Sequence, residues 1–310
     1  MSQSSFGNKF KVTTWGESHG KALGAVIDGC PAGLPLCEED IQKFLDRRKP
    51  GQSRYTTARK EGDLVEILSG VFEGKTTGTP ISLMVRNTDQ RSRDYGNIAY
   101  SYRPGHADYT FDQKYGFRDY RGGGRSSGRE TIGRVAAGAI ASKILEELGI
   151  SICTYTRSIG PVEIASFNKE EIHQNAFYMP DAQAAVKAGE YLEECMKNQD
   201  SAGGVIECRI TGTPAGLGEP VFDKLSALLA HALMSIGAVK AVEIGDGIAV
   251  TSSNGSTDND GFTVKDGEII KTSNHAGGIM GGISDGSEII LRAHITVSYT
   301  HLRAHETLSD

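Results

Sequence analysis

The chain has 310 residues, of which 38% are hydrophobic and 23% are charged, and its formal net charge at pH 7 is −6. The acidic balance argues against a general nucleic-acid partner, and the lack of an apolar run of about 18 residues argues against a membrane span. Residues 1–12 have no signal-peptide core, so we expect a cytoplasmic protein. The five cysteines fit neither a CxxC metal motif nor a disulfide framework, and we expect no metal site.

The first part of the chain alternates short apolar runs with glycine turns. It predicts strands over 23–27, 64–71 and 81–85, and a helix over 38–48 that is acidic at its start and basic at its end. Residues 87–128 are polar, basic and aromatic with little periodicity, which is typical of a functional or mobile loop. A clear helix follows, because apolar residues recur at helical spacing from Ile132 to Leu148.

The second part of the chain mixes helices and strands in the same way. Helices are predicted over 181–197 and 221–236, and strands over 205–210, 239–244 and 288–295. No linker, low-complexity segment or fold-level repeat divides the chain. The sequence therefore predicts a single α+β domain with helices packed against sheets.

Two motifs carry histidines that suit acid–base chemistry. GESHG at 16–20 places His19 between glycines, where a ligand can approach the imidazole closely; an exposed turn is the alternative. YRPGHAD at 102–108 combines a cation, an imidazole and the carboxylate of Asp108 in one irregular segment, and a loop with one satisfied histidine is its alternative.

Two further motifs carry arginines that suit anion binding. RRKPGQSR at 47–54 contains Pro50-Gly51, which indicates a shaped loop rather than a solvated helix face. RGGGRSSGRET at 121–131 leads into the clear helix, where free backbone N–H groups and the helix dipole favour phosphate. A capped helix start needs one serine, not three glycines with three arginines, so this is the strongest phosphate-binding signal in the chain.

These motifs, in this order, resemble those of the chorismate synthase family. The resemblance covers residues 6–295 and includes GLGEPVFDKL at 216–225 and HAGGIMGGISDG at 275–286. It implies a β-α-β sandwich subunit in a homotetramer. It also implies 1,4-anti elimination of phosphate from 5-enolpyruvylshikimate 3-phosphate to give chorismate. The reaction has no net redox change but requires reduced FMN, regenerated with NAD(P)H by a separate or intrinsic reductase.

The resemblance also implies roles for individual residues. His19 would assist departure of the phosphate, and His106 would manage the charge of the reduced flavin. Substrate phosphate and carboxylates would be held by Arg48, Arg54, Arg103 and Arg129. Flavin contacts would come from Arg125, Ser126, Ser127, Gly237, Ala238 and Gly281, and Gly237 would contribute through its backbone alone.

The resemblance stops near Ile295. Residues 296–310 do not continue the family pattern, and LRAH at 291–294 recurs at 302–305. We therefore expect a chorismate synthase-like domain over 1–295, incomplete at its C-terminal end, and a tail foreign to the family over 296–310. An inactive flavin- or anion-binding remnant is one alternative. A flavin oxidoreductase that uses nicotinamide directly is another, and the absence of a G-x-G-x-x-G fingerprint counts against it.

Overall fold

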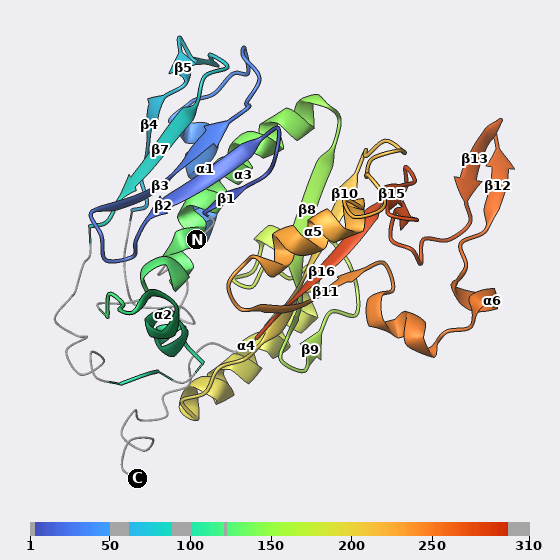
Figure 1. Ribbon diagram of the computed structural model, residues 1–310. Helices are drawn as coiled ribbons and strands as arrows, with labels where there is room; N and C mark the ends of the chain where they lie inside the picture. The colour runs from blue at the N-terminus through green and yellow to red at the C-terminus, as the bar shows by residue number, and fades with distance from the viewer. Residues whose placement is uncertain (1–3, 50–61, 89–100, 104, 121–122, 297–310) are drawn as a thin grey trace. The chain divides into compact units, whose positions relative to one another are not determined.

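Figure 1 shows the protein as a computed structural model that describes residues 4–49, 62–88, 101–103, 105–120 and 123–296. The chain groups into two compact units; the described residues of the first end at Ile144, and those of the second begin at Leu145. Each unit contains a five-stranded antiparallel sheet. Because helices pack against both sheets, the architecture agrees with the predicted α+β class.

The sheet of the first unit has the strand order β1-β2-β3-β7-β4, and its pairings are antiparallel. Its strands are β1 (Ser5–Phe6), β2 (Lys11–Gly16), β3 (Ala22–Asp28), β4 (Val65–Ser69) and β7 (Ile81–Arg86). A ribbon of β5 (Val71–Phe72) and β6 (Lys75–Thr76) follows β4. The helices are α1 (Glu38–Arg48), α2 (Asp108–Tyr115) and α3 (Thr131–Glu147), with 3₁₀ turns η2 (Gly124–Ser126) and η3 (Gly128–Glu130) before α3.

Alternation along β3 and β7 gives this sheet one buried apolar face. The side chains that cover it come from both strands and from α1 and α3: Leu23, Ala25, Ile27, Ile81, Leu83, Val85, Ile41, Leu45, Ile132, Ala136 and Ile140. Gly133 allows α3 to lie close to β3, because a Cβ atom at 133 would be 2.8 Å from the carbonyl oxygen of Gly24. The start of α3 is thus fixed against the sheet.

Four strand ends gather at one edge of this sheet. β2 ends where β3 begins, and the register pairs Gly16 with Leu23. At the same edge Ala22 of β3 pairs with Arg86 of β7, and Val65 of β4 pairs with Val85. Segments that enter or leave these ends are therefore neighbours in space, although they are far apart in sequence.

The second unit is built on a sheet of order β11-β16-β10-β8-β9. Its strands are β8 (Ser151–Ile159), β9 (Val162–Glu163), β10 (Gly204–Thr211), β11 (Val239–Ile244) and β16 (Ile289–Ile295). Two small antiparallel ribbons are β12 (Phe262–Lys265) with β13 (Glu268–Lys271), and β14 (Ile279–Met280) with β15 (Ile283–Ser284). The helical elements are η4 (Lys169–His173), α4 (Ala182–Lys197), α5 (Leu225–Met234), η5 (Gly247–Ser252) and α6 (Gly255–Asp258).

The two faces of the second sheet differ in chemistry. On one face Leu225, Leu229 and Leu233 of α5 pack over Ile289 and Leu291 of β16. On the other face the buried carboxylate of Glu207 on β10 binds three side chains of its two neighbouring strands: the Tyr155 hydroxyl and the Arg157 guanidinium of β8, the latter at 2.8 Å, and the Arg292 guanidinium of β16 at 2.6 Å. A buried carboxylate needs such partners, and here they join β8, β10 and β16.

The structure corrects three element boundaries. The segment 87–128 contains the helix α2, which its weak apolar periodicity concealed. The strand predicted over 64–71 is divided into β4 and β5 at Gly70, whose φ of +83° breaks the extended backbone. The helix predicted over 221–236 begins only at Leu225, because the backbone of Glu219 pairs with that of Asp223 and leaves Phe222 90% exposed.

Helix α4 gives the first testable prediction. The Asp181 carboxylate accepts hydrogen bonds from the backbone N–H groups of Gln183 and Ala184 at the helix start and from those of Ala165 and Ser166. Hydrogen bonds from Ala184, Ala165 and Ser166 lower the pKa of Asp181 to about 2. Asp181→Ala should therefore lower the free energy of unfolding by roughly 1–2 kcal/mol at pH 7.

The sign of the pH dependence follows from the lowered pKa. The stabilisation by ionised Asp181 is complete above the unfolded-state pKa of about 3.9 and is lost as the pH falls through about 2. Urea unfolding of the wild type and Asp181→Asn should show a stability difference that shrinks as the pH is lowered from 5 toward 3. A difference that grows over that range would contradict the assignment.

Candidate functional site

In the first unit two predicted substrate arginines share one buried carboxylate. Arg48 Nη1 lies 2.7 Å from Asp63 Oδ2, and Arg129 Nη2 lies 3.1 Å from Asp63 Oδ1. The Asp63 side chain has no exposed surface, and its φ of 46° is one that aspartate tolerates better than most residues. Within this described triad two cations face one anion, and the excess positive charge suits the binding of a further anion.

Both arginines are also fixed by neutral partners. Arg48 Nε donates to the Thr131 hydroxyl at 3.2 Å, which links the end of α1 to the start of α3. Arg129 Nε and Nη2 donate to Asn87 Oδ1 at 3.1 and 2.8 Å. The guanidinium of Arg129 is thereby held between Asp63 and Asn87, at the edge where the strand ends gather.

The motif at 16–20 forms the turn between β2 and β3. The N–H of Gly20 donates to the carbonyl oxygen of Glu17 at 3.0 Å. His19 Nδ1 lies 3.1 Å from the hydroxyl of the buried Ser18. Asn87 Nδ2 donates to the carbonyl oxygens of Glu17 and Gly20, at 3.0 and 2.7 Å, so this turn is tied to the arginine cluster.

The glycine- and serine-rich segment before α3 folds as two 3₁₀ turns rather than as a direct helix start. Arg125 donates to the carbonyl oxygens of Gly16 and Thr14 at 3.1 and 3.2 Å and to the Thr14 hydroxyl at 2.6 Å. The Ser126 hydroxyl donates to the Gly123 carbonyl, and the Ser127 hydroxyl accepts from the N–H of Arg129. The Arg125 side chain therefore anchors this loop to β2 as well as carrying charge.

The motif at 102–108 forms a second cluster in the same unit. Arg103 binds Asp108 with two nitrogens, Nε at 2.8 Å and Nη2 at 2.7 Å. His106 Nδ1 lies 2.9 Å from Asp108 Oδ1 and 3.1 Å from Arg103 Nη2. Arg118 is the fourth member of the cluster. Its Nε lies 3.8 Å from Asp108 Oδ1, and its guanidinium group lies over the ring of Tyr102.

This environment sets the charge of each member. Burial and the neighbouring Arg103 lower the pKa of His106, although Asp108 opposes the shift. Burial opposes ionisation of Asp108, but hydrogen bonds from the Arg103 side chain and backbone prevail and lower the pKa of this carboxyl to about 2. At pH 7 His106 is therefore a neutral imidazole beside an ionised carboxylate.

The remaining predicted flavin positions lie in the second unit, at opposite ends of α5. Gly237 and Ala238 follow α5, and Ala238 has a φ of +69°. Gly281 lies between β14 and β15, and the carbonyl of the adjacent Gly282 accepts from the N–H of Leu225, the first residue of α5. A ten-residue helix is about 15 Å long, so a ligand contacting both ends must lie along α5.

Arg54, the fourth arginine of the predicted substrate set, lies outside the described residues. Two important partners, Asp63 and Asn87, are absent from the sequence motifs. The many arginines of the motifs could have pointed to Asp63, because buried guanidinium groups need a carboxylate partner. The position of Asn87, directly after a predicted strand and at the start of the irregular segment, is a weaker signal.

Two other features of the second unit do not build a site. Asp246, Asp258 and His275 present potential metal ligands within 4.8 Å of one another. An ion pair of 2.7 Å between His275 and Asp246 accounts for the proximity of two of the three. The hydrogen bond to Asp246 raises the pKa of His275.

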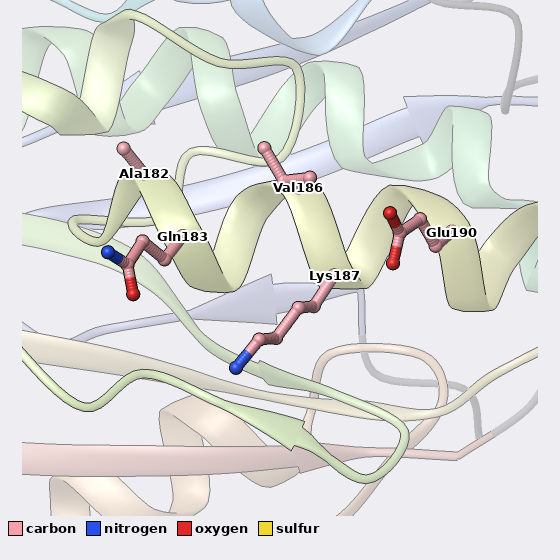
Figure 2. Close-up of a pocket in the computed structure, with 5 residues that line it drawn as sticks. All are labelled: Ala182, Gln183, Val186, Lys187 and Glu190. Carbon is pink, nitrogen blue, oxygen red and sulfur yellow. The ribbon is translucent and has the colours of Figure 1, made fainter.

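A surface hollow lies along α4 (Figure 2), lined by Ala182, Gln183, Val186, Lys187 and Glu190. All five residues belong to one helix, so the hollow has a single wall. It contains none of the predicted site residues. It therefore offers no enclosed ligand site.

Comparisons with known proteins agree with these features. The sequence model of the family described as chorismate synthase matches residues 10–309, and so continues past Ile295. The chorismate synthase of Agathobacter rectalis is 66% identical over 297 residues, which are 95% of this chain and 81% of that protein. Those of Lachnoclostridium phytofermentans and Lachnospira eligens are 64% and 62% identical, and the matches cover 100% of this chain and 85% of each relative.

A solved structure gives the same result. A crystal structure of chorismate synthase superimposes with a TM-score of 0.80 at 35% sequence identity, over 94% of this chain and 84% of that chain. The fold, the site and the relatives define an enzyme of the lyase class. The chain belongs to the chorismate synthase family.

Family membership confirms the predicted family, the fold type and the catalytic function, and gives no support to an inactive remnant. Membership of this family implies a small-molecule substrate and a reduced flavin cofactor. No helix in the described part of the chain is long and apolar enough to cross a membrane. Residues 297–310, most of the predicted foreign tail, lie outside the described residues.

Asp63 can be tested by substitution. Asp63→Asn preserves shape but leaves the guanidinium groups of Arg48 and Arg129 without their carboxylate, so we expect a loss of roughly 3–5 kcal/mol in the free energy of unfolding. Asp46→Asn is the matched control, because the Asp46–Lys49 pair is exposed and should be worth less than about 1 kcal/mol. Equal losses in the two variants, measured by urea unfolding, would refute the central role of Asp63.

The neutral state of His106 is also testable. Its pKa, followed by NMR of the imidazole, should lie below the ordinary value of about 6.5. Arg103→Gln removes a nearby cation and should raise this pKa, whereas Asp108→Asn removes an anion and should lower it further. Shifts in the opposite directions would show that other groups govern the charge of His106.

Proposed function

We propose that this chain is a carbon–oxygen lyase acting on a phosphate ester, and that it converts 5-enolpyruvylshikimate 3-phosphate to chorismate with reduced FMN as its flavin. The observation that supports this most directly is the Arg48–Asp63–Arg129 cluster, tied by Asn87 to the turn that carries His19. It brings a net positive charge and an acid–base group to one edge of a sheet. Loss of phosphate needs both, because negative charge develops on the leaving group.

The reaction breaks the allylic C–O bond to phosphate and removes a proton from the carbon in the 1,4 relation. The electron pair of the C–H bond enters the ring system as the phosphate departs with the C–O pair. Phosphate, a proton and a diene are the balanced result, with no net oxidation. The protein must therefore hold the substrate anions, stabilise the leaving group and control protons.

Arg48 and Arg54 hold the substrate phosphate and carboxylates in this proposal, with Arg103 and Arg129 assisting. Guanidinium groups bind such anions with paired hydrogen bonds. Arg129 is only 6% exposed, so its main contribution is to orient the Asp63–Arg48 pair and add to the local field. His19 gives a proton to the departing phosphate, and the Ser18 hydroxyl at its Nδ1 fixes the orientation of the ring.

The residues proposed to hold the flavin fit such a group. Among the described residues, no heavy atom lies within 4 Å of the Cβ position built at Gly237 or Gly281, so a flat ring can approach the backbone there. Ala238 of the second unit and, in the first unit, Arg125, Ser126 and Ser127 are the other proposed flavin contacts. When bound, reduced FMN supplies electron density to the reacting allylic system. His106, neutral and beside Asp108, accommodates a change of charge or a proton next to that ring.

We further propose a cytoplasmic homotetramer, with no nucleic-acid or membrane partner, in which residues 1–295 belong to the catalytic domain. Reduced flavin would be regenerated with NAD(P)H. Self-association is supported by exposed apolar side chains of the second unit, including Val221 at 71% and Phe222 at 90% exposure. Light scattering of the purified chain measures the assembly directly.

The test of function is an anaerobic assay with chemically reduced FMN and 5-enolpyruvylshikimate 3-phosphate, in which phosphate release and chorismate absorbance are followed together. His19→Ala and His106→Ala should each lower kcat by about 10²–10⁴-fold, the range expected for a lost acid–base group. Arg48→Ala should mainly raise KM. His173→Ala is the control, because His173 is exposed and lies outside the proposed site. Wild-type kinetics in all three site variants would overturn the residue assignment.

A further inference from the structure

We propose that Asn87 is a positioning residue for the elimination, and that its side-chain amide sets the placement of the His19 turn relative to the arginine pair. The inference rests on the proposed role of His19 and adds to it a second residue. Asn87 follows β7 directly, and its own N–H donates to the carbonyl oxygen of Lys21 at 3.1 Å. Its backbone is thus fixed by the edge where β3 and β7 pair.

One end of the amide holds the histidine turn. Nδ2 donates to the carbonyl oxygens of Glu17 and Gly20, and these two carbonyls lie on either side of His19 in the sequence. A single NH₂ group therefore fastens both ends of the segment that carries the imidazole. Loss of those two bonds would free the turn from Asn87, while the Gly20-to-Glu17 backbone bond within the turn is retained.

The other end of the amide holds the arginine cluster. Oδ1 accepts from Nε and Nη2 of Arg129, and Arg129 in turn binds Asp63. Asp63 binds Arg48, so the turn and the substrate arginine are joined through three side chains. The hydrogen bonds in this chain measure 2.7–3.1 Å.

The chemistry requires this residue type. The amide uses two donors toward carbonyl oxygens and two lone pairs toward a guanidinium group, which is its full hydrogen-bonding capacity. Aspartate has the same shape and can accept from Arg129, but in its ionised form it cannot donate to Glu17 and Gly20. Asn87→Asp therefore removes the hydrogen bonds to Glu17 and Gly20 and preserves those from Arg129.

Asn87→Asp should lower kcat by about 10–100-fold, because a displacement of about 1 Å of an acid–base group costs up to 10²-fold. The KM for the substrate should rise as well, because a second carboxylate beside Arg129 cancels the excess positive charge that the cluster presents to the substrate anion. Asn87→Ala removes both sets of hydrogen bonds and should lower kcat and raise KM together. The imidazole resonances of His19 should move in both variants when they are followed by NMR.

The matched control is Asn175→Asp. Asn175 is another fully used amide: it donates to the carbonyls of Glu171 and Met179 and accepts from the N–H groups of Phe177 and Met179. It lies outside the proposed site. Its substitution should lower Tm without changing kcat per folded molecule, which is the behaviour of a purely structural amide.

The outcomes separate the inference from the function on which it rests. Loss of activity in His19→Ala with a kcat within twofold of wild type in Asn87→Asp overturns the role of Asn87 alone. Full activity in both variants overturns the proposed role of His19 as well. A kcat loss in Asn87→Asp that is reproduced by Asn175→Asp also overturns the inference. Asn87→Ser, which keeps one donor and adds no charge, should lower kcat and change KM by less than about threefold, and it replaces Asn87→Asp if that variant does not fold.

Discussion

The buried carboxylate of Asp63 is the interaction on which the site of the first unit depends. Two guanidinium groups brought close together repel one another by several kcal/mol at an effective dielectric constant near 20. Asp63 offsets that repulsion by taking one arginine on each oxygen, and a net positive charge remains for a ligand. The cation cluster can therefore exist before any anion binds, and no reorganisation is needed when the leaving group develops charge.

The sheet explains why residues so distant in sequence meet at Asp63. β4 begins just after it, β7 ends just before Asn87, and the His19 turn joins β2 to β3 at the same edge. The close contact of Gly133 with Gly24 sets α3 against this sheet, and the turns before α3 supply Arg129. Strand register and one helix contact thus determine the relative positions of the acid–base group and the cations.

Much of this arrangement can be predicted from the sequence. The residues and elements that cannot be predicted from it share physical causes. The helix at 38–48 and the strands at 81–85 and 205–210 are visible in periodicity and end charges, and the motifs identify His19, Arg48 and Arg129 by residue type. Asp63 and Asn87 are not visible, because their importance arises from strand register, which places them opposite residues 40 or more positions away. Helix α2 is hidden because polar contacts rather than an apolar stripe hold it, as with Arg118 on Asp112 at 2.9 Å.

The two proposed catalytic histidines have different surroundings, and the difference indicates how His106 acts. Both oxygens of Asp108 receive hydrogen bonds from Arg103, and Oδ1 also lies 2.9 Å from His106 Nδ1. An ionised carboxylate is a stronger acceptor than an imidazole nitrogen, so the favoured tautomer carries its proton on Nδ1 and donates it to Asp108. Nε2 is then a lone-pair site, which suits His106 to accept a proton or hydrogen bond from a bound ring. His19 lies beside the neutral Ser18 hydroxyl on a glycine turn, where a ligand can approach the imidazole, and is suited to the donor role.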